Sequence, residues 1–293
     1  MSASGKGADL PAIWIDGRRA PSEGPHVSAL DRGLTLADGL FETMRVSHGT
    51  VFRLDAHLAR LGRGLAALGI RAPARLREEV LEAVREAGAD DAAVRLTVTR
   101  GIGEGGVRVS AGSRPTLVIV VSPVPEFPRA IFEVGLTAHV ASGRRNERAM
   151  TAGLKTLAYT DAVAALVEAA RAGAGEALFL DTNGHCSEAS SSNLFVWTGG
   201  RLLTPPVSCG ALPGITRAVV LELAGALDVP VEERAFGPDE LIGAHEAFLT
   251  SSLRGLAPLV RVGDRPVGDG TPGEMTRRFS REYAALVDRE CRV

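Results

Sequence analysis

The chain has 293 residues, a formal net charge of −2 and a pI near 6.3. Nucleic acids and anionic membranes attract basic surfaces, so this charge balance argues against partners of either kind. The longest apolar runs, such as 117–121, have the length of a strand and cannot span a bilayer. Residues 1–10 contain one lysine and no apolar core, so we expect a loose tail and not a signal peptide. These features predict a cytoplasmic globular protein, long enough for two domains.

The three cysteines, Cys186, Cys209 and Cys291, contain no C-x-x-C pair and leave an odd thiol. They therefore indicate neither a disulfide framework nor a zinc site. The six histidines show no pairing at i, i+4, so no metal site is expected.

Hydrophobic periodicity predicts the elements of the first part of the chain. Strands are expected at 12–16, 40–46, 51–53, 93–99 and 116–121. Helices are expected at 54–68 and from about 74 to 87, and residues 31–33 open an irregular stretch. The segment 122–128 contains three prolines, which cannot pair in a sheet and stiffen a connection.

The second part mixes strands and helices without strict alternation, which is typical of an α+β fold more than of a doubly wound sheet. Its predicted strands are 132–140, 177–180, 193–197, 201–204, 247–250 and 257–262, and a polar loop is expected at 142–148. Its predicted helices follow Lys155 and then occupy 213–227, 238–242 and about 272–289. We expect a flexible tail at 1–11, a small N-terminal domain at 12–122, a linker at 123–130 and a larger C-terminal domain at 131–293.

Lys155 is the outstanding candidate for chemistry, because the chain contains only two lysines and the other, Lys6, lies in the tail. A sequence that otherwise uses arginine for positive charge keeps a lysine where a primary amine is needed to attack a carbonyl. The apolar positions after it (Ala162, Val163, Leu166, Val167 and Ala170) predict a helix whose mouth holds the lysine.

Other motifs are weaker taken singly. The glycine-rich loop 101–106 lacks a following helix that could receive a pyrophosphate, and 190–192 lacks the G-x-S-x-G elbow of serine hydrolases. Leu212-Pro-Gly-Ile-Thr-Arg217 predicts a helix start, whose free N–H groups can bind phosphate. Glu188 lies among small residues that let a flat ligand approach, or it ends a solvated strand. Arg60 is expected on the exposed face of its helix.

Six ordered segments resemble the class IV, fold-type IV pyridoxal-phosphate enzymes. This family includes branched-chain and D-amino-acid aminotransferases, (R)-selective amine transaminases and aminodeoxychorismate lyase. The resemblance runs from Ile13 to about Tyr283. Its markers are DRGLTLADGLFETMR (31–45), HLARL (57–61), GLKTL (153–157), SEASSSNLF (187–195), LPGITR (212–217) and FLTSSLRG (248–255).

The resemblance implies a two-domain fold that holds pyridoxal 5′-phosphate between its domains, in a homodimer that completes the site. It makes Lys155 the catalytic lysine, which forms a Schiff base with the cofactor. Glu188 is similar to the carboxylate that binds the pyridine nitrogen, which favours its protonation. The other residues expected to bind the cofactor are Arg60, Tyr159, Ser192, Asn193, Ile215, Thr216 and Ser252.

The expected reaction is amino transfer between an amino acid (of D-amino-acid or branched-chain type) or an (R)-amine and a 2-oxo acid. Leu36 and Ala37 depart from the family pattern, and the P-R-x-H carboxylate trap of many D-amino-acid enzymes is absent. The turn 250–255 and the loop 144–147 look closer to aminodeoxychorismate lyase, which releases pyruvate and p-aminobenzoate and is the alternative. The residues expected to line the substrate pocket are Leu36, Phe41, Arg108, Ser251 and Arg254. Arg254 is expected to hold the substrate carboxylate with two hydrogen bonds.

Overall fold

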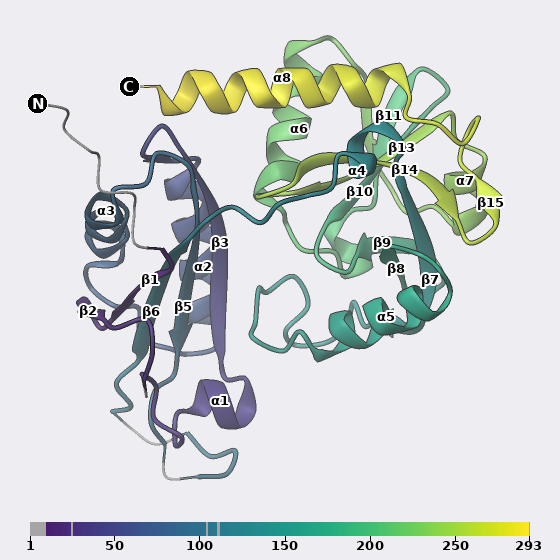
Figure 1. Cartoon of the computed structure of the whole chain (residues 1–293). Coiled ribbons are helices and arrows are strands. Elements are labelled where there is room, and N and C mark those ends of the chain that lie inside the picture. Colours follow the sequence, from purple (N-terminus) through teal and green to yellow (C-terminus); the bar gives the residue numbers. More distant parts are fainter. Residues whose placement is uncertain (1–9, 25, 104, 110–111, 293) are drawn as a thin grey trace, which may run out of the picture. The chain divides into compact units, whose positions relative to one another are not determined.

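The computed structural model describes residues 10–24, 26–103, 105–109 and 112–292. Most of the predicted tail, up to residue 9, lies outside them. The chain forms two compact units (Figure 1). The N-terminal unit contains residues up to Pro125 together with Lys155–Leu157 and Val287–Val293. The C-terminal unit contains Glu126–Leu154 and Ala158–Leu286. The domain boundaries expected from the sequence stay predictions.

The N-terminal unit is built on one antiparallel sheet with the strand order β2-β1-β6-β5-β3-β4. Its strands are β1 (Ala12–Ile15), β2 (Arg18–Ala20), β3 (Gly39–Ser47), β4 (Thr50–Val51), β5 (Ala92–Thr99) and β6 (Thr116–Ser122). Helix α2 (Leu54–Ala67) packs on β3 and α3 (Leu76–Ala87) packs on β6.

Side chains of the central strands alternate between the two faces of this sheet, as the strand period requires. Met44 and Val46 of β3 and Leu96 and Val98 of β5 are buried at 0% exposure. The intervening positions are more open, since Thr43 and Thr97 are half-buried and Arg95 is exposed. Phe41, Ala93 and Thr99 are buried on this more open face, each at 5% exposure.

The C-terminal unit contains a nine-stranded sheet in which β10 pairs with β9 as well as β13. The path β10-β13-β14-β7-β8-β9 thereby closes on itself, like a barrel. Closure occurs where Asn193 of β10 lies opposite Glu188 of β9. The strands are β7 (Leu136–Arg145), β8 (Glu176–Asp181), β9 (Cys186–Ala189), β10 (Asn193–Thr198), β11 (Arg201–Thr204), β12 (Val231–Glu233), β13 (Glu246–Ser251), β14 (Gly255–Val262) and β15 (Arg265–Pro266).

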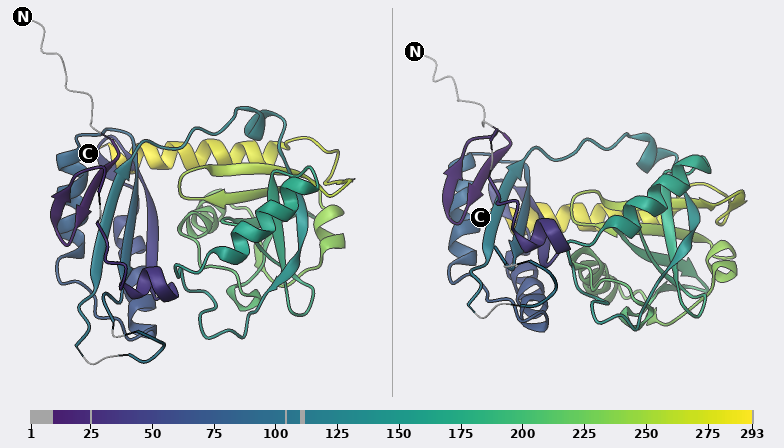
Figure 2. Two further views of the ribbon diagram at one scale, coloured as in Figure 1. Left: turned by 60° about the horizontal axis from the view of Figure 1, so that its bottom comes forward. Right: turned by 90° about the horizontal axis from the view of Figure 1, so that it is seen from below.

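Apolar side chains of these strands fill the core, including Leu178, Leu194, Leu249 and Leu259. The helices of this unit and its 3₁₀ turn can be followed in Figure 2. They are α4 (Ala130–Glu133), α5 (Thr160–Arg171), η1 (Val207–Cys209), α6 (Ile215–Ala226), α7 (Pro238–Ile242) and α8 (Glu274–Cys291), the last continuing into residues grouped with the N-terminal unit. No helix of the described residues is long and apolar enough to cross a membrane.

The predicted strand at 132–140 is wrong in its first half. Helix α4 occupies Ala130–Glu133, and β7 begins only at Leu136 and runs through the predicted loop to Arg145. Gly135 makes the break with φ +97°, and a Cβ there would lie 2.4 Å from Cγ1 of Val260. Only a glycine permits this close approach to β14.

Six further short elements were not predicted: α1, β2, β9, η1, β12 and β15. Helix α1 (Arg32–Leu36) falls in the irregular stretch, where the Asp31 side chain caps it by accepting from the Gly33 N–H. Strands β9 and β12 are also additions. They have few apolar residues of their own and form because neighbouring strands offer hydrogen-bonding edges.

Helix α5 is present, but its expected buried face is wrong. Ala162, Ala165 and Ala169 are buried, whereas Val163 and Val167 are 58% and 46% exposed. Small side chains allow the helix to lie close on β7 and β8, which leaves the larger apolar residues outside.

Candidate active site

Lys155 is held by backbone pairing with the first residues of β3. Its carbonyl oxygen accepts from the Phe41 N–H at 3.0 Å, and the Leu157 N–H donates to the Gly39 carbonyl at 3.0 Å. A Cβ on Gly39 would lie 2.6 Å from the Val98 carbonyl oxygen, so only a glycine lets β3 lie this close to β5 at this position. The backbone position of Lys155 is therefore set by bonds on both sides of it.

The Lys155 ammonium lies over an aromatic ring that it shares with an arginine. Its Nζ is 4.5 Å from the centroid of the Phe41 ring, and Cζ of Arg95 is 3.9 Å from the same centroid. Arg95 was not among the predicted site residues. The polar alternation along β5 (Arg95, Thr97, Thr99) was the only signal for it, because its neighbour Phe41 lies on a different strand.

Arg60 is buried at 6% exposure, so the expected exposed position is wrong. Its Nε and Nη2 donate to the two carboxylate oxygens of Glu42 at 2.8 and 2.5 Å. Nδ1 of His57 lies 2.7 Å from Oε2 of the same carboxylate. Glu42 and His57 are both buried, at 0% and 1% exposure. Glu42 thus orients the guanidinium that was expected to bind phosphate.

The pKa values of this group follow from its burial and charges. Burial acts to raise the pKa of Glu42, but hydrogen bonds from Arg60 and His57 outweigh it and hold the pKa below its usual value. Burial lowers the pKa of His57, and the charges of Arg60 and Lys155 lower it further against the opposing effect of Glu42. Glu42 is therefore the negative charge that balances Arg60.

Glu188 of β9 is held from two sides. Its Oε2 accepts from the Leu212 N–H at 2.8 Å. Nε of Arg145 lies 3.1 Å from Oε1, an ion pair in which the N–H is not directed at the oxygen. The Arg145 guanidinium in turn stacks 4.1 Å from the Phe179 ring centroid. The carboxylate is thus fixed in orientation by groups on other segments of the chain.

The beginning of α6 has the features of a phosphate site. Gly214 caps the helix without a side chain, so the N–H groups of Ile215 and Thr216 keep no intrahelical partner. Asn193 anchors this start, because its Nδ2 donates to the Leu212 carbonyl at 2.8 Å. A Cβ on Gly214 would lie 1.9 Å from Oδ1 of Asn193, which requires glycine at the cap.

Hydroxyl groups at the end of β13 lie next to Asn193. Oγ1 of Thr250 is buried and has no hydrogen-bond partner among the described residues. Thr250 lies opposite Asn193 in the β10–β13 pairing, and Ser251 and Ser252 follow it at partly buried positions. A buried hydroxyl without a partner is costly, and a polar ligand would satisfy it.

Arg254 lies in a buried ionic network. Its Nη2 donates to the Ser192 hydroxyl at 2.9 Å and to Oε2 of Glu176 at 3.3 Å. Oε1 of Glu176 accepts from the Ser190 hydroxyl at 2.5 Å. The network ties the turn after β9 to β8, and it places a carboxylate of the chain itself on the arginine that was expected to bind a substrate carboxylate.

Comparison with known proteins now identifies the family. The family model described as "Amino-transferase class IV" matches residues 39–262. The chain belongs to the class IV aminotransferase family. It is 31% identical over 268 residues to the D-alanine aminotransferase of Bacillus licheniformis, covering 90% of this chain and 93% of the relative.

Solved structures show the same fold. The branched-chain amino acid aminotransferase of Escherichia coli has a TM-score of 0.89 at 28% identity, with 94% of each chain covered. The 4-amino-4-deoxychorismate lyase of Pseudomonas aeruginosa has a TM-score of 0.85 at 35% identity, covering 94% of this chain and 99% of the other. The expected family and α+β fold are thereby confirmed.

Class IV aminotransferases use pyridoxal phosphate, so the expected cofactor is also confirmed. Another similar branched-chain amino acid aminotransferase, at TM-score 0.88 and 27% identity, contains pyridoxamine 5′-phosphate. Each unit of this class IV aminotransferase has groups that suit the cofactor. The N-terminal unit has a lysine on an ordered backbone. The C-terminal unit has an oriented carboxylate, a helix start capped by glycine, and a buried Thr250 hydroxyl with no hydrogen-bond partner among the described residues.

Three expected site residues, Leu36, Arg108 and Tyr159, have more open positions. Leu36, the last residue of α1, is 42% exposed. Ala37, which follows Leu36, adopts φ +53°, in the left-handed region that favours glycine. Arg108 is exposed, and its carbonyl accepts from Arg32 at 3.1 Å. Tyr159 is half-buried at the start of α5. Their roles stay predictions.

Cysteine chemistry plays no part in this site. The three cysteines are free and buried. Burial raises the pKa of Cys186 to about 12 and that of Cys209 to about 11, which favours the neutral thiol in both.

Proposed function

We propose that this class IV aminotransferase moves an amino group between an amino acid, of D-amino-acid or branched-chain type, or an (R)-amine and a 2-oxo acid. The observation that carries the proposal is the arrangement around Lys155. A primary amine with a fixed backbone shares one aromatic ring with the guanidinium of Arg95. The lysine amine is suited to the reaction, and the arginine is suited to bind the carboxylate of an amino-acid substrate.

Each residue has a distinct task in this proposal. Bound pyridoxal phosphate supplies an electrophilic aldehyde carbon and a ring that accepts electrons from the substrate Cα. Lys155 Nζ attaches the cofactor and then moves the proton at that Cα. Glu188 keeps the ring nitrogen protonated. The Arg60 guanidinium and the N–H groups of Ile215 and Thr216 bind the phosphate.

The remaining cofactor residues have supporting tasks in the proposal. Ser252 adds a hydroxyl to the phosphate, and Tyr159 donates to the phenolic oxygen. Ser192 and Asn193 act through the chain, because they hold Arg254 and the start of α6.

Glu188→Gln should bind the cofactor and turn over about a hundredfold more slowly. The amide keeps a similar shape but cannot hold the ring nitrogen protonated. Single-turnover rates and the absorption of the bound cofactor measure the two effects separately. Glu168→Gln, at the exposed ion pair with His139, is the control and should keep normal rates. Normal turnover in Glu188→Gln would contradict the assignment.

The substrate carboxylate is assigned here to Arg95 in place of Arg254, because Arg254 already pairs with Glu176. Arg95→Ala should raise KM for amino acids by about tenfold or more, on the order of 1.4 kcal/mol, and leave that for a carboxylate-free (R)-amine nearly unchanged. Steady-state kinetics with both substrates measures this. The same pair of measurements on Arg254→Ala discriminates the two arginines. Equal losses for amino acid and amine in Arg95→Ala would overturn its role.

The second candidate is 4-amino-4-deoxychorismate lyase activity, favoured by the 35% identity with the Pseudomonas aeruginosa enzyme. The deciding experiment mixes the holoenzyme with D- and L-amino acids, (R)-amines and aminodeoxychorismate. Conversion of the bound cofactor to its amine form identifies a transaminase. Release of pyruvate and p-aminobenzoate without that conversion identifies the lyase and overturns the first proposal.

We also propose that the enzyme acts as a homodimer in the cytoplasm. Helix α5 leaves Val163, Leu166 and Val167 exposed along one face, and Met150 is fully exposed. An apolar face of this kind marks a protein interface. Sedimentation should give twice the mass of the 30.6 kDa chain, and a monomer would contradict the proposal.

A further inference from the structure

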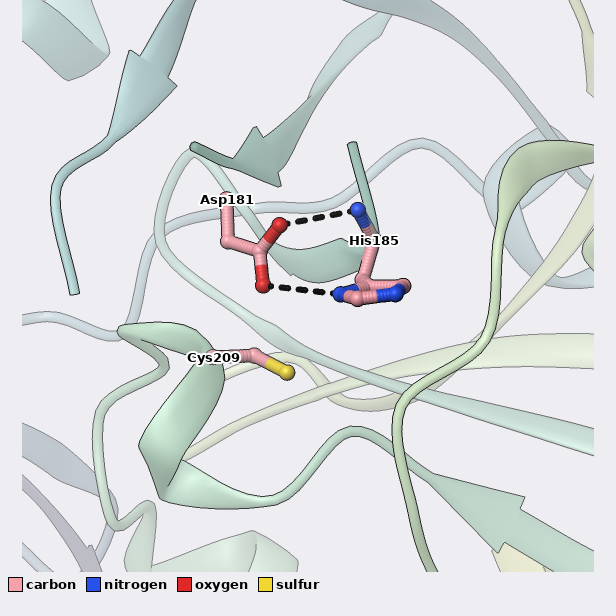
Figure 3. A group of neighbouring side chains, drawn as sticks. All are labelled: Asp181, His185 and Cys209. Atoms are coloured by element: carbon pink, nitrogen blue, oxygen red, sulfur yellow. Dashed lines mark hydrogen bonds and ion pairs between the residues drawn. The ribbon is translucent and has the colours of Figure 1, made fainter. Parts of the chain in front are cut away.

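Three side chains able to bind a metal ion converge on the C-terminal unit, outside the residues assigned above. Asp181 ends β8, His185 precedes β9, and Cys209 ends η1. One ligand atom from each lies within 4.8 Å of the other two. Figure 3 shows Cys209 beside Asp181 and His185, which are joined to each other by two hydrogen bonds. Sequence spacing did not reveal this group, because the cysteine comes from a separate segment.

The spacing of the first two ligands already suits a tetrahedral ion. Oδ2 of Asp181 lies 3.2 Å from Nδ1 of His185. Zinc bonds of about 2.0–2.2 Å to nitrogen and oxygen place two such ligands roughly 3.3 Å apart at the tetrahedral angle. A zinc–sulfur bond of about 2.3 Å places the thiolate roughly 3.5 Å from each. The Cys209 sulfur lies within 4.8 Å of both ligand atoms.

Neighbouring groups hold the carboxylate in place for this role. Oδ1 of Asp181 accepts from the N–H groups of Asn183 and His185, at 2.9 and 2.8 Å, while Oδ2 faces the His185 imidazole. Such outer hydrogen bonds are what orient the ligands of metal sites.

Access to the group differs from ligand to ligand. Asp181 and Cys209 are 2% and 4% exposed, whereas the His185 side chain is 43% exposed. The group is therefore open to solvent on the histidine side.

We propose that Asp181, His185 and Cys209 bind one Zn²⁺ ion, with water as the fourth ligand. The mixture of nitrogen, oxygen and thiolate donors selects zinc over magnesium or calcium. The thiol gives up its proton to solvent as the zinc–sulfur bond forms, and His185 binds through Nδ1 with its ring proton on Nε2 in place of the hydrogen bond to Asp181. The ion ties Cys209 to the turn after β8. Three residues further along, Leu212 donates its N–H to Glu188, so bound zinc stabilises the segment that orients that carboxylate.

Cobalt is the probe for this site, because tetrahedral Co²⁺ absorbs in the red, where the cofactor does not. Metal-free holoenzyme titrated with Co²⁺ should develop these bands with one equivalent, and Zn²⁺ should abolish them. Cys209→Ser should lose the bands, and His185→Gln should bind at least about tenfold more weakly. Cys291→Ser is the matched control, a buried cysteine outside the group, and should retain both bands and stoichiometry.

Two outcomes would overturn the site: no tetrahedral spectrum at one equivalent, or unchanged bands in Cys209→Ser. His185 is partly exposed, so His185→Gln is expected to fold normally, and its melting curve checks this. Undiminished affinity in folded His185→Gln would likewise contradict the proposal. Amino-transfer activity is not needed for any of these readings, so they stand apart from the test of function.

Discussion

Lys155→Arg should abolish turnover, with a loss on the order of a thousandfold or more. The substitution keeps a positive charge, but a guanidinium cannot bond covalently to the cofactor's aldehyde. The backbone of residue 155 is hydrogen-bonded to β3 independently of its side chain, so the fold should persist. Turnover, the absorption of the bound cofactor and the melting temperature together separate a chemical defect from a folding defect.

The low lysine content of the chain makes it easy to check that the cofactor is attached to Lys155. The chain has only two lysines, so borohydride reduction of the holoenzyme and peptide mapping can place the cofactor only on Lys155 or Lys6. Lys6→Arg is the matched control and should keep full activity. A cofactor adduct on Lys6, or an active Lys155→Arg enzyme, would rule out Lys155 as the attachment point.

Glu42→Gln should lower the free energy of unfolding by about 3–5 kcal/mol, because it removes the buried carboxylate that pairs with the Arg60 guanidinium. Urea denaturation of the cofactor-free protein at neutral pH measures this. Glu82→Gln removes the carboxylate of an exposed pair with Arg75 and should cost about 0–1 kcal/mol. A cost for Glu42→Gln as small as that of the control would show that the buried pair contributes little.

The pH dependence of the same variant has a definite sign. The folded-state pKa of Glu42 lies below its unfolded value, so its contribution is fully present above the unfolded pKa and is lost as pH falls through the folded pKa. The difference in stability between the native chain and Glu42→Gln should therefore shrink as the solution becomes acidic. A difference that grows on acidification would contradict the lowered pKa.

The sequence by itself determined the chemistry that is available. A lone body lysine, a carboxylate among small residues and a Pro-Gly helix start could be identified from residue types, because attachment and phosphate binding need those types. The ordered motifs then indicated the family and its cofactor. Regular elements such as α2 and β5 followed from local periodicity, which depends on near neighbours in the chain.

Tertiary structure alone decided which side chains meet. Arg60 looked exposed on its helix, yet Glu42 on β3 draws it into the interior. Arg95 acquired a neighbour in Phe41, and Arg254 acquired a buried carboxylate in Glu176, only when strands paired. Cys209 reaches Asp181 through the packing of η1 on β9. These pairings lie between 18 and 78 positions apart in sequence, and no local pattern encodes them because strand register and packing bring them together.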